Sequence, residues 1–155
     1  RAILRSAAAL LLRARAAADR EAAARRRTAR ALLDRLVEID SVHAIAPVDG
    51  AEPGYLRLPL RVANGRARSP ADAARLGIAP AYPRPLSMLP ALRDRLAGPE
   101  RRFPGAESLA SSLITLPTHS AVTPHDVQAL VRALRAADEG SHPTPRPHPR
   151  PVRAG

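Results

Sequence analysis

The sequence begins with a long stretch that contains neither glycine nor proline, although the whole chain has 8 glycines and 17 prolines. Residues 3–38 are dominated by Ala, Leu, Arg and Glu, which favour the α-helix. We therefore predict one long helix over residues 3–38, with a break near Ala18 and Asp19 as the alternative. At helical spacing its apolar side is narrow, so the helix needs a partner surface. That side is formed by Ala22, Ala29, Leu33 and Leu36.

The start of the chain allows two interpretations. The first residue is Arg rather than Met, and the apolar run at residues 7–12 faintly resembles a signal segment or part of a transit peptide. We favour the other interpretation, in which the chain enters the helix part-way along a longer protein, because helical periodicity continues past any cleavage point. No run of about 18 apolar residues is present, so the sequence predicts no membrane-spanning helix. The absence of cysteine fits a cytoplasmic protein.

The core is expected to be small. Apolar residues make up 45% of the chain, but many are alanine, which buries little area. The aromatic residues are Tyr55, Tyr82 and Phe103. The core must therefore be built from Leu, Val and Ile around few aromatic side chains, which excludes a large one.

Two segments after the long helix are predicted to be strands. The first spans Val42–Ala46, and the second spans Gly54–Val62, where apolar residues alternate with arginines. Pro59 lies inside the second segment and has no backbone N–H, so we expect an edge strand or a bulge there. Asn64 and Gly65 then predict a turn.

Two short motifs predict where later helices begin. In Ser69–Asp72, and again in Thr123–Asp126, a hydroxyl residue that can cap a helix is followed by Pro and then by Asp. Gly77 is placed to end the first of these helices. The second helix has an apolar stripe at helical spacing, which predicts a buried face. Its members are Val127, Leu130, Val131 and Leu134.

The segments between these two helices are short. Residues 79–90 contain several prolines and predict an extended loop, and residues 89–96 predict one or two helical turns. A short helix over residues 104–113 and a short strand over residues 114–116 follow.

The order of elements predicts an α+β fold, in which a small sheet carries helices packed against it. We expect a long helix over residues 1–40 and a small α+β domain over residues 41–138. Residues 139–155 are rich in Pro and Arg and have little apolar surface, so we expect a disordered tail.

The sequence predicts no complete catalytic or metal site. Asp34, Glu38 and Asp40 gather at the end of the long helix, where a solvated helix end explains them better than acid–base chemistry. His119 and His125 are close in sequence, but no Cys or further His completes a zinc set. Neither a nucleophile elbow nor a glycine-rich phosphate loop is present.

The chain is strongly basic, with a formal net charge of +11 that is carried by arginine because the sequence contains no lysine. Arg25, Arg26 and Arg27 could contact phosphates, but base stacking needs aromatic residues and no nucleic-acid-binding motif is present. We therefore prefer a solvated arginine face and predict no nucleic-acid partner. The alternative function is a stand-alone basic binding module, which would use the helix around Arg25 and the tail to hold an acidic partner.

Four segments follow one another in an order and spacing that carry a further signal. They are the Arg-rich residues 21–33, the strand 54–62, the proline loop 76–86, and residues 103–119. The last of them has a Pro, an Ala and a short helix before a Leu-Pro-x-His pattern that ends at His119. Together they resemble the carboxy-terminal part of the DegT/DnrJ/StrS sugar-aminotransferase family, which are pyridoxal-phosphate enzymes of the aspartate-aminotransferase fold.

The resemblance implies a small domain beside a missing large domain, from which the helix over residues 1–40 would lead. It also implies a homodimer with active sites at the interface. Family enzymes hold pyridoxal phosphate as a Schiff base on a lysine of the large domain. A chain without lysine is therefore expected to hold no catalytic and no cofactor-binding residue, and not to transaminate alone.

The resemblance also suggests substrate contacts. Tyr82 matches the tyrosine of a His-Tyr pair in the family's loop, whereas Ala81 stands in place of that His and Ser87 lies near the position of a second His. Tyr82 and Arg84 are the predicted substrate contacts, with Tyr82 as an aromatic core anchor being the alternative. Arg57 is a third candidate because its fork could meet an anionic group, although an outward-facing strand arginine is the interpretation we prefer.

Overall fold

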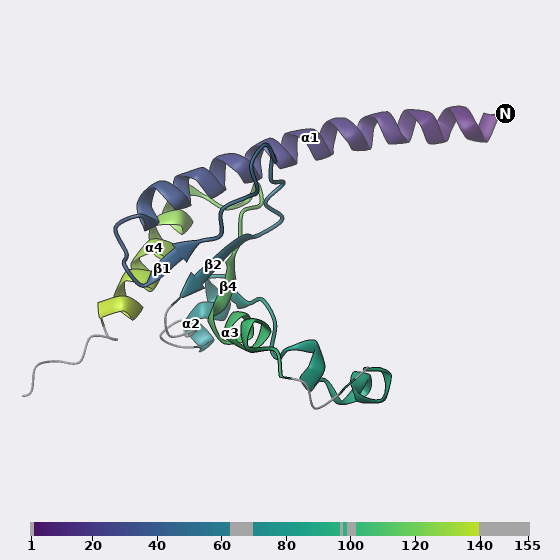
Figure 1. Ribbon diagram of the computed structural model, residues 1–155. Helices are drawn as coiled ribbons and strands as arrows, with labels where there is room; N and C mark the ends of the chain where they lie inside the picture. Colours follow the sequence, from purple (N-terminus) through teal and green to yellow (C-terminus); the bar gives the residue numbers. More distant parts are fainter. Residues whose placement is uncertain (1, 63–69, 97, 99–101, 140–155) are drawn as a thin grey trace, which may run out of the picture.

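The computed structural model describes residues 2–62, 70–96, 98 and 102–139 (Figure 1). A long helix precedes a small sheet, short helices lie between its strands, and a last helix closes the described chain, which confirms the α+β class. The bounds are α1 Ala2–Leu36, β1 Val42–Ala44, β2 Leu58–Val62, α2 Pro70–Arg75, β3 Ala79–Pro80, 3-10 helices η1 Leu86–Met88 and η2 Pro90–Arg95, α3 Pro104–Ser112, β4 Leu113–Leu116 and α4 Pro124–Glu139.

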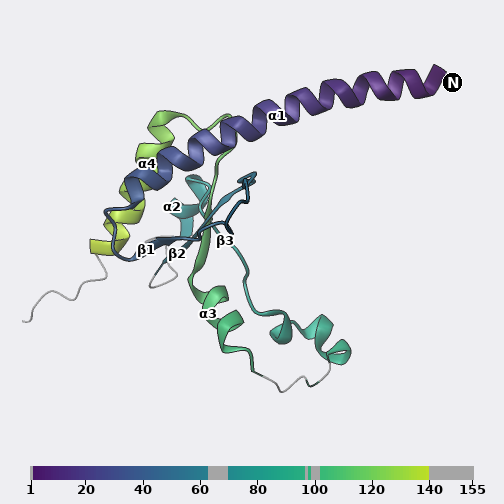
Figure 2. The same cartoon turned by 45° about the horizontal axis from the view of Figure 1, so that its top comes forward.

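Helix α1 is continuous, so the alternative break near Ala18 is absent. Its second half packs beside α4 over one face of the sheet (Figures 1 and 2). The buried residues of this half are Ala29, Leu32 and Leu36, whereas Leu33 is only partly buried. The buried face of α1 is therefore centred on Leu32 rather than on the predicted Leu33. The prediction placed this face slightly too far around the helix axis. The first half of α1 extends beyond the sheet, and its residues 7–20 are exposed.

The sheet has the strand order β1-β2-β4-β3, and all of its neighbouring strands are antiparallel. Its register places apolar residues opposite one another: Val42 faces Val62, Leu60 faces Ile114, and Leu58 faces Leu116. All of these residues are buried, so one face of the sheet is apolar and lies under α1 and α4. The alternate residues of β2 are partly or fully exposed.

Strand β2 is shorter than the predicted strand over Gly54–Val62, because it begins only at Leu58. Tyr55 has a φ of 41°, which turns the chain out of the extended conformation. The expected edge position of Pro59 is also wrong for the sheet as a whole, since β2 lies between β1 and β4. The pairing of β2 with β1 starts at Leu60, however, so Pro59 has a neighbouring strand on the β4 side only. On the β1 side no backbone hydrogen bond is lost through the absent N–H of Pro59.

The predicted local signals explain how α4 begins and how α2 ends. Thr123 and Asp126 form a reciprocal capping box: the Thr123 amide donates to Asp126 Oδ2 over 2.9 Å, and the Asp126 amide donates to Thr123 Oγ1 over 3.2 Å. Gly77 ends the turn after α2 with a φ of 70°, as predicted. Ser69, the predicted Asn64-Gly65 turn and residues 140–155 of the predicted tail lie outside the described residues.

Residues 81–96, which follow β3, extend away from the sheet and from α1 (Figures 1 and 2). The predicted loop over residues 79–90 overlaps them, although its first two residues form β3 and three later ones form η1. The helical turns expected at residues 89–96 are the 3-10 helix η2. Helix α3 and strand β4 lie where they were predicted, within one residue.

The buried stripe of α4 leads to a stability prediction. Leu130 is 1% exposed in the core, so Leu130→Ala should lower the free energy of unfolding by roughly 2–4 kcal/mol through lost burial and the cavity left behind. Gln128→Ala on the exposed side of the same helix is the matched control and should change it little. Urea denaturation of both variants checks this, and an equal, small effect would show that the stripe is not core.

Candidate functional site

Tyr82 and Arg84 lie directly after β3, at the start of the extension that leaves the sheet. Tyr82 is 61% exposed and Arg84 is also exposed, whereas the neighbouring Pro85 is buried. Tyr82 is therefore not an anchor of the core, and the aromatic residue that packs against the core is Tyr55. Both predicted substrate residues are free to meet a ligand or another part of a larger protein.

Arg57, the third predicted substrate residue, lies at the base of the same extension rather than beside Tyr82. Its Nε donates to Thr115 Oγ1 over 2.7 Å and its Nη2 donates to the Thr115 carbonyl over 3.0 Å. Nη2 also donates to the Gly77 carbonyl, in the turn that precedes β3. Arg57 is thus neither a free anion-binding fork nor an outward-facing strand residue, because it precedes β2 and is half-buried.

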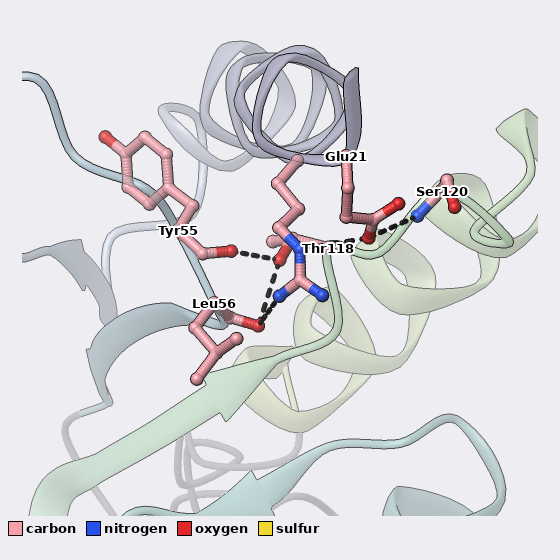
Figure 3. A network of polar contacts seen from close by, with 6 residues as sticks. Glu21, Tyr55, Leu56, Thr118 and Ser120 are labelled. Atoms are coloured by element: carbon pink, nitrogen blue, oxygen red, sulfur yellow. Dashed lines mark hydrogen bonds and ion pairs between the residues drawn. The ribbon is translucent and has the colours of Figure 1, made fainter. Parts of the chain in front are cut away.

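A second group of polar contacts joins α1 to the sheet (Figure 3). At its centre lies Thr118, a fully buried residue two positions after the end of β4. Its hydroxyl donates to the Tyr55 carbonyl over 2.5 Å. Arg25 of α1 donates through Nη1 to the neighbouring Leu56 carbonyl over 2.9 Å. The carbonyls of Tyr55 and Leu56 would pair with a neighbouring strand if β2 were longer. Instead they are bound by side chains, one from Thr118 after β4 and one from Arg25 of α1.

Glu21 completes this contact on the helix side. Its Oε1 accepts from Arg25 Nε over 3.0 Å and from the Ser120 amide over 3.2 Å. The spacing of Glu21 and Arg25, four residues apart on one helix, favours this pair. The further link from Glu21 to the turn after Thr118 depends on residues far away in the sequence. Figure 3 shows Glu21 pointing from the helix toward Ser120. The pKa of Glu21 lies below its ordinary value, mainly because of hydrogen bonding from Ser120 and also because of the Arg25 charge.

The other polar residues singled out in the sequence do not gather into a site. His119 and His125 are exposed, and Asp126 is engaged in the cap of α4. Hydrogen bonds from Thr123 lower the pKa of Asp126. Glu38 pairs with Arg135 at the surface over 3.0 Å, as expected of a solvated helix end. Among the described residues, no cluster of His, Cys, Asp or Glu has a geometry that could hold a metal ion.

The arginines of α1 are partly taken up by carboxylates. Arg25 pairs with Glu21, and Arg26 Nε lies 3.3 Å from Glu52 Oε1, whereas Arg27 and Arg30 are exposed. The prediction of a solvated arginine face is therefore correct for Arg27 and Arg30 but not for Arg25 and Arg26. Within the part of the chain that the structure describes, no helix has both the length and the apolar character needed to cross a membrane.

Sequence reasoning missed the structural roles of Thr118 and Arg57. Thr118 sits in the Leu-Pro-x-His pattern, where a small hydroxyl residue between a buried strand and a helix cap could have suggested a backbone contact. Arg57 gives no such signal, because its acceptors come from residues 77 and 115, far away in the sequence.

Comparison with known proteins shows to which family this small sheet with its two covering helices belongs. A profile of the DegT/DnrJ/EryC1/StrS aminotransferase family matches residues 4–135. This match covers most of the chain. The chain therefore belongs to the DegT/DnrJ/EryC1/StrS aminotransferase family. No curated protein matches it in a direct sequence comparison.

Solved structures agree with this assignment. DesV of S. venezuelae, solved with a ketimine intermediate, matches with a TM-score of 0.67 at 23% identity over 83% of this chain and 35% of its own. The aminotransferase TlmJ of Streptoalloteichus hindustanus matches with a TM-score of 0.63 at 26% identity over 79% and 33%. The sugar aminotransferase CalS13 of Micromonospora echinospora matches with a TM-score of 0.59 at 22% identity over 76% and 31%. The matched region is thus only about a third of each of these chains.

The contact between Glu21 and Ser120 predicts a pH dependence. Because the folded pKa of Glu21 is below its unfolded value of about 4.5, its contribution to stability is complete above that pH and is lost as the pH falls through the folded pKa. Glu21→Gln should therefore be less stable than the original protein near neutral pH, and the difference should shrink in acid. Asp126 titrates in both proteins and cancels in this comparison.

Urea denaturation at a series of pH values from neutral to acid measures this difference. A difference between the two proteins that stays constant across the series would contradict the assigned contact, since an uncharged substitution would then cost the same in every protonation state.

Proposed function

We propose that this chain is the small domain of a pyridoxal-phosphate-dependent aminotransferase that acts on a sugar nucleotide or a related carbonyl substrate. The observation that carries the proposal is the family match over residues 4–135. One of the similar structures is a sugar aminotransferase, which supports the substrate class. This chain matches only about a third of the length of each similar structure, which supports a longer parent protein.

In this proposal, residues 1–40 lead from a large domain into the small domain of residues 41–138. Helix α1 supports the arrangement, because its first half has no other described element beside it and exposes apolar residues. Leu10, Leu11 and Leu12 are between 67% and 70% exposed. A helix that exposes such residues is expected to lie against further protein, and the large domain is the partner that the family assignment suggests.

The cofactor would be held by the large domain. The residues of this chain do not fit a covalent attachment of pyridoxal phosphate, because the sequence has no lysine to form a Schiff base and its arginines do not lose their protons. When bound in the parent enzyme, the cofactor supplies the electron sink for amino-group transfer. This chain is accordingly proposed to be inactive alone.

Tyr82 and Arg84 are the residues of this chain that we propose to contact the substrate. They are exposed, lie two residues apart, and start the extension that leaves the sheet. A phenol and a guanidinium at this spacing can stack on a sugar or base and pair with a phosphate. We further propose a cytoplasmic homodimer, in which two such extensions reach active sites at the subunit interface.

Family membership favours this function over a stand-alone basic module. The module was expected to use the helix around Arg25, but Arg25 and Arg26 are held by Glu21 and Glu52. Its other expected part, the Arg/Pro tail, lies outside the described residues except for Glu139.

An absorbance measurement tests the proposal on the chain itself. The purified 155-residue chain, incubated with pyridoxal phosphate and dialysed, should show no near-visible band from a lysine-bound cofactor, because no lysine is available. The longer parent protein, treated in the same way, should retain such a band and shift it when an amino donor is added. A retained, donor-sensitive band on the short chain, or none on the parent, would overturn the proposal.

A further inference from the structure

The extension that carries Tyr82 and Arg84 is attached to the sheet by very little backbone. Strand β3, from which it starts, has only the residues Ala79 and Pro80. Pro80 has no N–H to donate, and the next backbone bond to β4 is from the Ala81 amide to the Leu113 carbonyl over 3.0 Å. A two-residue edge strand with one proline cannot by itself hold a long segment in a fixed direction.

The side chain of Arg57 reinforces this attachment from the other side of β4. Its two donor nitrogens bind both the carbonyl and the hydroxyl of Thr115, the residue that pairs with Ala79. The Thr115 hydroxyl accepts from Arg57 and in turn donates to the Ala79 carbonyl over 3.3 Å. A continuous relay therefore runs from Arg57 through Thr115 to the first residue of β3.

Arg57 also fixes the turn that leads into β3. Its Nη2 donates to the Gly77 carbonyl, and Gly77 has a φ of 70° that L side chains rarely adopt. The same glycine lies against Pro117, since a Cβ there would be 3.3 Å from Pro117 Cγ. The turn, the strand and the sheet are thus held together at one point, directly before Tyr82.

We propose that Arg57 is a positioning residue for the substrate side of the site: it sets the direction in which residues 81–88 leave the sheet, and so places Tyr82 and Arg84. Planar, bidentate donation to Thr115 is the property that suits arginine for this role. The inference rests on the proposed function of Tyr82 and Arg84. It replaces direct substrate contact by Arg57, because two of its three nitrogens are already committed.

The aromatic content of the chain allows a direct test. The sequence has two tyrosines and no tryptophan, so Tyr55→Phe leaves Tyr82 as the sole tyrosine. Tyr55 enters the contact with Thr118 through its backbone carbonyl, which this change retains. In the full 155-residue chain with Tyr55→Phe, the decay of tyrosine fluorescence anisotropy then reports the nanosecond motion of the extension at Tyr82.

Arg57→Lys keeps the charge but loses the planar fork, and Thr115→Val keeps the shape but loses the hydroxyl relay. Both should raise the amplitude of nanosecond motion at Tyr82 by about twofold, into the range of a mobile loop. Thr115→Ser should show the same amplitude of motion as the Tyr55→Phe chain without a further change, because it retains the hydroxyl. Arg132→Lys is the matched control, since Arg132 is an exposed arginine of α4, and should leave the motion unchanged.

Thermal unfolding measured on the same samples separates positioning from general stability. If Arg57→Lys lowers the melting temperature while the motion of Tyr82 stays unchanged, Arg57 is only a structural residue and the proposal is wrong. If Arg57→Lys does not fold, Thr115→Val decides, because it retains the Arg57 bonds to both carbonyls. None of these results depends on whether Tyr82 meets a substrate, so the proposed substrate contact can fail separately, through an unchanged KM in a Tyr82→Ala variant of the longer enzyme.

Discussion

Burial of a single face of the sheet is the interaction on which the rest of the structure depends. Leu58, Leu60 and their partners on β4 lie on that face, and the stripes of α1 and α4 cover it. Apolar residues of α2 and of the segment between α2 and β3 also pack against this core, namely Ala73, Leu76 and Ile78. The opposite face is left to half-exposed residues such as Pro59 and Thr115, and it is there that the arginine relay lies.

Backbone groups at the ends of short strands create the two polar contacts that orient the parts of the chain. The carbonyls of Tyr55 and Leu56 lie before β2 and are bound by Thr118 and Arg25, which fixes α1 against the sheet. The carbonyls of Gly77 and Ala79 lie at β3 and are held through Arg57 and Thr115. Buried or half-buried carbonyls need such partners, so each strand that ends early requires a side chain from elsewhere. One contact therefore directs the helix and the other directs the extension.

Local sequence signals predicted most of the fold, because they depend on neighbouring residues. The capping box of α4, the glycine after α2 and the stripe around Leu130 each act within a few positions, and all were confirmed. The errors arose where distant residues decide the outcome. Apolar alternation suggested a strand from Gly54, but Thr118 and Arg25 hold the carbonyls before Leu58 and the φ of Tyr55 turns the chain. Tyr82 was chosen by resemblance and Arg57 for its guanidinium fork, and only the geometry shows that Arg57 is bound within the chain whereas Tyr82 is exposed.

The central claim is that this chain is one domain of a longer aminotransferase, and the mass of the native gene product tests it most directly. An antibody raised against residues 103–126 detects that product by immunoblot of cell extract. The account predicts a band far above the 16.5 kDa of this chain, because the similar structures are about three times as long as the part matched. A single band at 16.5 kDa would contradict it, since the large domain and its lysine would then not be joined to these residues.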